Sequence, residues 1–238
     1  MSLPGSVNLP TLILLPGLDG TGIRLGEFVR NLGPGVDSLI VAYPKDQPLG
    51  YDELEALVLA AAPNDRAFVV LAESFSGPIA IRIAARSPAG LVGVILCGTF
   101  ARNPFPWLGW ARGLATYLPI KSIPRWIRAP LIWGSASPRA APAQMQRAIA
   151  GVASSVVRRR IAALLAVDES AALRRIRVPA LVIKARRDRV ISAAATRRIL
   201  DALPAAQLLE IDGPHLLLQT RPGQCAAAVI EFMRALAA

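Results

Sequence analysis

The sequence predicts an α/β fold with a mostly parallel sheet of about six strands, covered by helices on both faces. Three observations predict it. Short apolar runs recur along the chain without polar alternation, as in strands that are buried on both faces. One helical segment separates each run from the next, which is the order of a parallel sheet. The alternation breaks after Phe100 and resumes near residue 177, which predicts an insertion in the sheet.

The first part of the chain supplies the strands and helices before this break. The predicted strands are apolar runs that end in turn residues, at residues 11–15, 38–43, 68–72 and 91–97. The predicted helices have apolar residues at helical spacing and cover residues 23–32, 51–62 and 79–86. The second of them begins with Asp52 and Glu53, whose negative charges favour a helix N-terminus.

A helical cap is predicted between the fourth and fifth strands. This segment is punctuated by prolines, holds all four tryptophans, and has its helical stretches at residues 107–117, 143–150 and 154–165. An insertion after a strand of a parallel sheet lies over the carboxyl edge, where such sheets bind ligands. The chain therefore divides into a core, residues 1–101 and 173–238, and a helical cap insertion, residues 102–172.

The sheet pattern resumes after the cap. Two further strands are expected at residues 178–184 and 207–211, and two further helices at residues 193–203 and 222–236. A length of 238 residues suits one such domain, and no second domain is needed.

Composition limits the classes of protein that fit. The chain is 53% hydrophobic and 18% charged, unlike the polar composition of disordered chains. Its apolar runs are shorter than the roughly 20 residues that a membrane helix needs. No Lys or Arg precedes the apolar run at residues 9–18, so no export signal is expected. We therefore expect a soluble, cytoplasmic protein without a transmembrane segment.

The net charge of +11 raises the question of an anionic partner. Arginines are spread along the chain in short clusters, and no nucleic-acid-binding module is present, so nucleic acid is not expected as a partner. Attraction of anionic substrates or lipid surfaces stays open. Cys97 and Cys225 have no metal or redox spacing and are predicted to be buried free thiols. We expect no metal and no cofactor.

Ser74 lies at a predicted strand-to-helix turn. Small residues, Ala72 and Ser76, stand two positions before and after it, where the nucleophile elbow of serine hydrolases, G-x-S-x-G, has glycines. These residues alone also fit an ordinary turn with an exposed serine.

Two more polar residues follow predicted strands. Asp188 comes after the fifth strand and His215 after the sixth, so both should reach the same sheet edge as Ser74. His215 is the only histidine in the chain. A lone histidine is usually structural, but a serine and an aspartate at the same edge favour a general base.

These features resemble the α/β-hydrolase superfamily, in which the triad follows the order Ser, acid, His. The resemblance covers the loop at residues 16–22, the elbow at 72–77, the acid turn at 187–190 and residues 213–215. More narrowly, residues 15–22 and 73–77 are similar to bacterial esterases and plant plastid esterase/acyltransferases. The resemblance implies an α/β-hydrolase fold and a serine esterase.

The resemblance also implies a role for each residue. Ser74 would be the nucleophile, His215 its base, and Asp188 the group that holds the imidazole in the correct tautomer. The oxyanion hole would be formed by the backbone N–H groups of Leu18 and Phe75. Relatives often have His-Gly where this chain has Pro16-Gly17, but the donor is a backbone group in either case.

Four charged residues stand beside the predicted site residues in the sequence. Arg187 and Arg189 either keep Asp188 ionised or simply face solvent. Asp19 and Glu73 are predicted to be structural rather than catalytic.

The sequence therefore predicts a carboxylic-ester hydrolase acting on a small-molecule ester with an apolar acyl or aryl group. Phe100, Phe105, Trp107 and Trp110 are the predicted walls of its pocket. Acyl transfer, thioester hydrolysis and C–C bond hydrolysis with the same triad remain alternatives, as does a non-catalytic receptor. A serine elbow excludes the aspartate nucleophile of epoxide hydrolases and dehalogenases, and the loop at residues 17–22 lacks nucleotide-binding spacing. The oligomeric state stays open.

Overall fold

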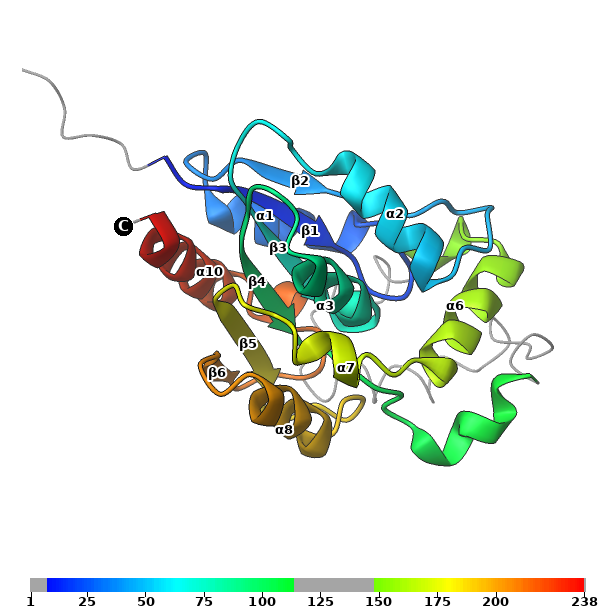
Figure 1. Cartoon of the computed structure of the whole chain (residues 1–238). Helices are drawn as coiled ribbons and strands as arrows, with labels where there is room; N and C mark the ends of the chain where they lie inside the picture. Colours follow the sequence, from blue (N-terminus) through cyan, green and yellow to red (C-terminus); the bar gives the residue numbers. More distant parts are fainter. Residues whose placement is uncertain (1–7, 114–147, 238) are drawn as a thin grey trace, which may run out of the picture.

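Six parallel strands form the centre of the fold (Figure 1). The computed structural model describes residues 8–113 and 148–237. The strands are β1 (Thr11–Leu15), β2 (Ser38–Ile40), β3 (Phe68–Glu73), β4 (Leu91–Cys97), β5 (Ala180–Ala185) and β6 (Gln207–Ile211). They lie in the order β2-β1-β3-β4-β5-β6, and every neighbouring pair is parallel. The predicted sheet is confirmed, and no antiparallel pair occurs within it.

Helices follow the strands as expected. The α-helices are α1 (Gly26–Leu32), α2 (Tyr51–Ala61), α3 (Gly77–Arg86), α6 (Ser154–Ala166), α7 (Ser170–Leu173), α8 (Ala193–Ala202), α9 (Leu217–Thr220) and α10 (Pro222–Ala237). Three 3₁₀ helices are described: η1 (Ile23–Leu25), η2 (Ser74–Ser76) and η3 (Pro106–Arg112). The four-residue helices α7 and α9 were not predicted, because so short a segment carries no apolar periodicity.

The strands send alternate side chains into two separate cores. In β3, Phe68, Val70 and Ala72 pack on the side of α2 and α3, whereas Val69 and Leu71 pack on the side of α1 and α10. Burying a large apolar side chain contributes about 1.5–3 kcal/mol to stability. Both cores therefore hold the carboxyl ends of the strands in a fixed arrangement.

The second strand is shorter than predicted and ends at Ile40. Beyond it, the chain turns toward the loop after β1, where Tyr43 N–H donates to the carbonyl of Gly20 at 2.7 Å. The Tyr43 ring is buried there. The buried apolar residues after Ile40 therefore pack outside the sheet, and this is why the predicted strand was too long.

The chain leaves and re-enters the core through two adjacent segments. Asn103 N–H donates to the carbonyl of Val167 at 2.9 Å, and Glu169 N–H donates to the carbonyl of Ala101 at 2.7 Å. This pairing supports an insertion with ends close to those expected, although the cap boundaries stay a prediction. The expected helix at residues 107–117 is the 3₁₀ helix η3, as far as the described residues reach. Trp126, Trp133 and most of the expected helix at 143–150 lie outside the described residues.

Two other sequence-based predictions can be compared with the structure. Cys97 and Cys225 are free and buried, as predicted. Burial raises the pKa of Cys97 well above its ordinary value and that of Cys225 to about 12. In the described parts of the chain, no helix has both the length and the apolar composition to cross a membrane.

Candidate active site

Ser74 occupies a strained turn between β3 and α3. Its φ of 52° lies in the left-handed region, which costs a non-glycine residue about 1–3 kcal/mol. The Thr99 side chain packs directly on the backbone of Gly77, where an added Cβ would lie 1.9 Å from Thr99 Oγ1. The tightness of the turn thus depends on Gly77, and Ala72 and Ser76 are both accommodated without exposure to solvent.

Side chains from other elements hold this turn in place. The Thr99 hydroxyl donates to the carbonyl of Ser74, and the Tyr51 hydroxyl donates to the carbonyl of Phe75 at 3.1 Å. The Tyr51 and Phe75 rings also stack, with their centroids 4.9 Å apart. These contacts oppose relaxation of the left-handed conformation at Ser74.

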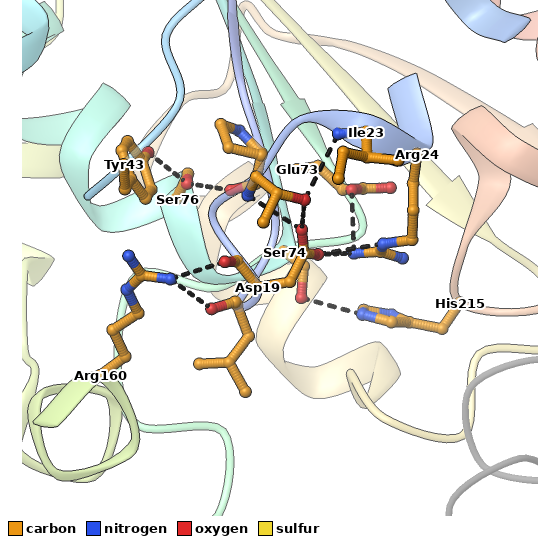
Figure 2. Close-up of polar contacts among 12 residues, drawn as sticks. Asp19, Ile23, Arg24, Tyr43, Glu73, Ser74, Ser76, Arg160 and His215 are labelled. Atoms are coloured by element: carbon orange, nitrogen blue, oxygen red, sulfur yellow. Dashed lines mark hydrogen bonds and ion pairs between the residues drawn. The ribbon is translucent and has the colours of Figure 1, made fainter. Parts of the chain in front are cut away.

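Ser74, His215 and Asp188 form one hydrogen-bonded chain. Ser74 Oγ lies 2.9 Å from His215 Nε2, and His215 Nδ1 lies 2.8 Å from Asp188 Oδ2 (Figure 2 shows the first of these contacts). The carboxylate at Nδ1 favours the tautomer with its proton there, which leaves Nε2 free to accept the serine proton. The structure thus brings together the three residues that the sequence placed at one sheet edge.

Backbone groups, rather than the neighbouring arginines, surround the second oxygen of Asp188. Its Oδ1 accepts hydrogen bonds from the N–H groups of Val190 and Ile191, each at 2.8 Å. Arg187 instead pairs with Asp212 at 3.0 Å on the surface, and Arg189 is exposed. Of the two readings of these arginines, the structure favours the solvent-facing one.

Gly98, directly after β4, lies against the backbone and ring of His215. Its φ is +51°, and an added Cβ would lie 3.3 Å from the His215 carbonyl oxygen and 3.6 Å from Nδ1. Sequence reasoning did not single out this glycine. A glycine directly after the predicted strand at residues 91–97, at the same sheet edge as the triad, was the sequence feature that could have indicated it.

The loop after β1 passes beside Ser74. Gly20 N–H donates to the Gly17 carbonyl at 2.9 Å, which closes a turn around Leu18 and Asp19. An added Cβ at Gly17 would lie 3.9 Å from Ser74 Cβ. In a trans peptide the N–H points away from the carbonyl, so the Leu18 N–H faces away from the inside of this turn. The proposed donors Leu18 and Phe75 therefore both belong to backbone next to Ser74.

Ser76 ties this loop to the elbow. Its hydroxyl donates to the carbonyl of Pro16 and lies 2.6 Å from the Tyr43 hydroxyl (Figure 2). Because the serine proton goes to Pro16, the Tyr43 hydroxyl is the donor to Ser76. The sequence suggested only that Ser76 is small enough for the turn, and this hydrogen-bonding role was missed.

Asp19 and Glu73 belong to a buried ionic cluster around Arg24. Asp19 Oδ2 accepts from Arg24 Nε at 3.0 Å, and Asp19 Oδ1 accepts from Thr21 N–H at 3.0 Å. Glu73 Oε2 lies 3.9 Å from Arg24 Nη2. Burial alone would raise the pKa of Asp19, but Arg24 and the Thr21 hydrogen bonds lower it below its ordinary value. These contacts support the structural role predicted for both acids.

The four predicted pocket residues have different surroundings. Phe100 is buried in the core on the α3 side of the sheet, and Phe105 packs edge-on against Trp107 with centroids 5.8 Å apart. The exposed fractions of Trp107 and Trp110 are 66% and 75%. The described residues form no enclosed apolar wall at these two tryptophans, and the pocket assignment stays a prediction.

A cavity of about 270 Å³ lies apart from the triad. It opens between α7 and α8 and is lined by residues that include Arg102, Leu173, Arg174, Ala195 and Arg198. The residues in the described ranges contain no group of three or more His, Cys, Asp or Glu side chains that could hold a metal ion.

A model of the alpha/beta hydrolase family matches residues 12–228. This chain belongs to the α/β hydrolase family. The match covers both the core and the insertion. It confirms the resemblance and the fold class that the sequence predicted. A search of curated proteins found no match to the sequence.

Several solved structures are similar to this chain. The enol-lactonase from Burkholderia xenovorans LB400 has a TM-score of 0.82 at 21% identity, over 95% of this chain and 92% of that one. A thermophilic esterase from Thermogutta terrifontis has a TM-score of 0.78 at 18% identity, over 97% and 91%. MenH from S. aureus has a TM-score of 0.78 at 14% identity, over 98% and 96%. At these identities the likeness shows the shared fold alone.

Proposed function

We propose that this protein is a serine esterase that hydrolyses small carboxylic esters through an acyl-enzyme on Ser74. The observation that carries the proposal is the hydrogen-bonded chain from Ser74 through His215 to Asp188 on a strained turn. A serine hydroxyl becomes a useful nucleophile when a base within hydrogen-bond reach accepts its proton. The family match makes a hydrolase the expected class of enzyme.

Acylation follows from this geometry. Ser74 Oγ attacks the ester carbonyl carbon while its proton passes to His215 Nε2. The carbonyl oxygen becomes an oxyanion, which accepts hydrogen bonds from the N–H groups of Leu18 and Phe75. Collapse of the intermediate breaks the bond to the alcohol, which takes the proton from His215. Asp188 stabilises the imidazolium that exists between the two proton transfers.

Deacylation repeats these steps with water. His215 Nε2 accepts a proton from the water, whose oxygen attacks the acyl carbon. The second tetrahedral intermediate collapses to the carboxylic acid, and the proton returns to Ser74 Oγ. An alcohol in place of water would give acyl transfer instead, so product analysis with competing alcohols separates hydrolysis from transfer. Thioester and C–C substrates test the other uses of the same triad.

The test compares two active-site variants with a matched serine variant. Ser74→Ala and His215→Ala should each lower the turnover of p-nitrophenyl esters by roughly 10⁴-fold or more. Ser87 is the other described non-glycine residue with positive φ (48°), and it is exposed at the end of α3. Ser87→Ala should therefore keep full activity. Near-wild-type rates in Ser74→Ala would disprove the proposal, and a wild type without activity on any ester would favour a non-catalytic receptor.

A further inference from the structure

Arg160 reaches from α6 into the loop that follows β1. Its side chain is fully buried, and Nη1 donates to the carbonyl of Leu18 at 3.0 Å and to that of Asp19 at 2.8 Å. Nη2 donates to the carbonyl of Pro44 at 2.9 Å. Figure 2 shows the guanidinium pointing at the two loop carbonyls. An arginine of the predicted cap thus contacts the residue whose N–H is a proposed oxyanion donor.

Burying the Arg160 guanidinium costs desolvation free energy, which packing of α6 through apolar side chains would avoid. None of the three acceptors is a carboxylate, and Nε has no hydrogen-bond partner in the described structure. Burial lowers the pKa of Arg160 below its ordinary value. The face of the Tyr43 ring, 5.5 Å from the guanidinium carbon, offsets part of this cost. An apolar side chain would join α6 to the core without burying a cation.

The loop carbonyls form an unbroken series of hydrogen-bond acceptors. Ser76 donates to Pro16, Gly20 N–H donates to Gly17, and Tyr43 N–H donates to Gly20. Arg160 supplies the donors for the remaining two, Leu18 and Asp19. Every peptide from Pro16 to Gly20 is thereby fixed in rotation. The Leu18 N–H shares its peptide with the Gly17 carbonyl, which accepts from the Gly20 N–H. The Gly20 N–H in turn shares its peptide with the Asp19 carbonyl that Arg160 holds, so Arg160 constrains the Leu18 N–H through Gly20.

The loop is shaped to admit the guanidinium. At Gly20 the φ is +69°, and an added Cβ would lie 2.5 Å from Arg160 Nη1. Only a glycine therefore leaves space for the arginine at this point. The loop conformation at Gly20 and the position of Arg160 on α6 are therefore matched to each other.

We propose that Arg160 is a positioning residue for the oxyanion hole, which holds the loop so that the Leu18 N–H faces the reacting carbonyl oxygen. This inference rests on the proposed esterase function. If it holds, the rate of the reaction depends on how α6 packs against the loop after β1. Arg160 itself touches no reacting atom, and its effect passes through the backbone of residues 17–20.

Arg160→Met tests the inference, because methionine keeps an unbranched side chain and removes every donor. The matched control is Arg159→Met, which removes an exposed arginine from the same helix. Full loss of one oxyanion donor lowers kcat by about 10²–10³-fold, so a misdirected donor should lower it by about 10–100-fold. KM should stay within about threefold, because ester binding precedes oxyanion formation. Arg159→Met should match the wild type.

Two readouts separate positioning from general stability. Active sites are counted by fluorophosphonate titration, so that kcat refers to folded enzyme only. A trifluoromethyl ketone, which forms a tetrahedral adduct with serine, should lose affinity by the same factor as kcat/KM. An unchanged kcat per titrated site in Arg160→Met would overturn the inference. Arg160→Lys is the second variant: one ammonium cannot span three carbonyls, so wild-type activity in it would also contradict the inference.

Hydrogen exchange tests the loop without reference to activity. The Gly20 and Tyr43 amides, which donate within the carbonyl series, should exchange at least about tenfold faster in Arg160→Met than in Arg159→Met. Equal exchange rates in the two variants would disprove that Arg160 holds the loop after β1. Absence of ester turnover in the wild type would disprove the proposed function alone and leave the exchange result to stand.

Discussion

Ser76→Gly, which gives the elbow the second glycine of G-x-S-x-G, should lower the free energy of unfolding of this protein. In most serine hydrolases of this fold a glycine at that position lets strand and helix approach. Here Ser76 carries a buried hydroxyl that donates to Pro16 and accepts from Tyr43. Ser76→Gly removes both hydrogen bonds at once and leaves two buried polar groups, a carbonyl and a phenol, without this partner.

The cost can be worked from these two groups. Each buried group that loses its partner costs about 1–3 kcal/mol, and water entering the small space that is left favours the lower end. Glycine adds about 0.5–1 kcal/mol through the freedom of the unfolded chain. We therefore expect about 3 kcal/mol of destabilisation in Ser76→Gly and about 2 kcal/mol in Ser76→Ala, which removes the hydroxyl alone.

Urea unfolding measures this loss directly. With a slope of about 2–3 kcal/mol per molar urea, the midpoint of Ser76→Gly should fall by about 1 M. The kcat should fall as well, because the Pro16 end of the oxyanion loop is released. Tyr43→Phe completes a double-mutant cycle with Ser76→Ala, and a coupling energy near zero would show that the two hydroxyls do not interact. A Ser76→Gly variant as stable as the wild type would refute the reasoning.

Two further predictions concern residues beside the triad. Gly98→Ala should lose about 1–2 kcal/mol of stability from its positive φ, and about tenfold in kcat because the new methyl group, 3.3 Å from the His215 carbonyl oxygen, shifts the His215 backbone by a few tenths of an ångström. Asp19→Asn should lose about 3 kcal/mol of unfolding free energy at pH 7, since it removes the nearer of the two buried carboxylates that pair with Arg24 and leaves only Glu73, 3.9 Å away. The folded pKa of Asp19 is lowered, so its stabilisation is present above the unfolded value of about 3.9 and is lost as pH falls through the folded pKa. The urea midpoints of Asp19→Asn and the wild type should therefore converge below about pH 4.

Each of these has a matched control in the chain. Gly33 has a φ of +73° and a ψ of 175°, with no atom near an added Cβ, so Gly33→Ala should lose at least as much stability and keep kcat. Equal kcat losses in the two alanine variants would show that backbone strain, and not contact with His215, is responsible. Asp46 is exposed, and Asp46→Asn should leave the urea midpoint unchanged at every pH. A constant difference between Asp19→Asn and the wild type down to pH 2 would contradict the assigned pKa direction.

The sheet and the triad could be predicted because both follow from local pattern and chain order. Strands buried on both faces have apolar sequences, and residues just past their carboxyl ends meet at one edge. Ser74, Asp188 and His215 each stand within a few positions of such an end. Their proximity in space could therefore be predicted although they are far apart in the sequence.

The supporting contacts could not be predicted, because they depend on tertiary packing between distant segments. Ser76 and Tyr43 are 33 positions apart, and nothing in either local sequence indicates that their hydroxyls meet. Arg160 closes a run of three arginines, a pattern typical of an exposed helix face, yet it is the buried member of the run. Trp107 and Trp110 show the opposite case, since aromatic residues expected in a pocket carry large exposed fractions.

Covalent labelling of Ser74 tests the central claim most directly. The wild type would be treated with a fluorophosphonate at neutral pH, and the digest would be examined by mass spectrometry for the tryptic peptide of residues 67–82. An activated serine predicts about one phosphonyl group per chain, located on Ser74 and absent in the His215→Ala variant, because the hydroxyl then lacks its base. An unlabelled Ser74 in folded wild-type protein, or equal labelling in His215→Ala, would contradict the account.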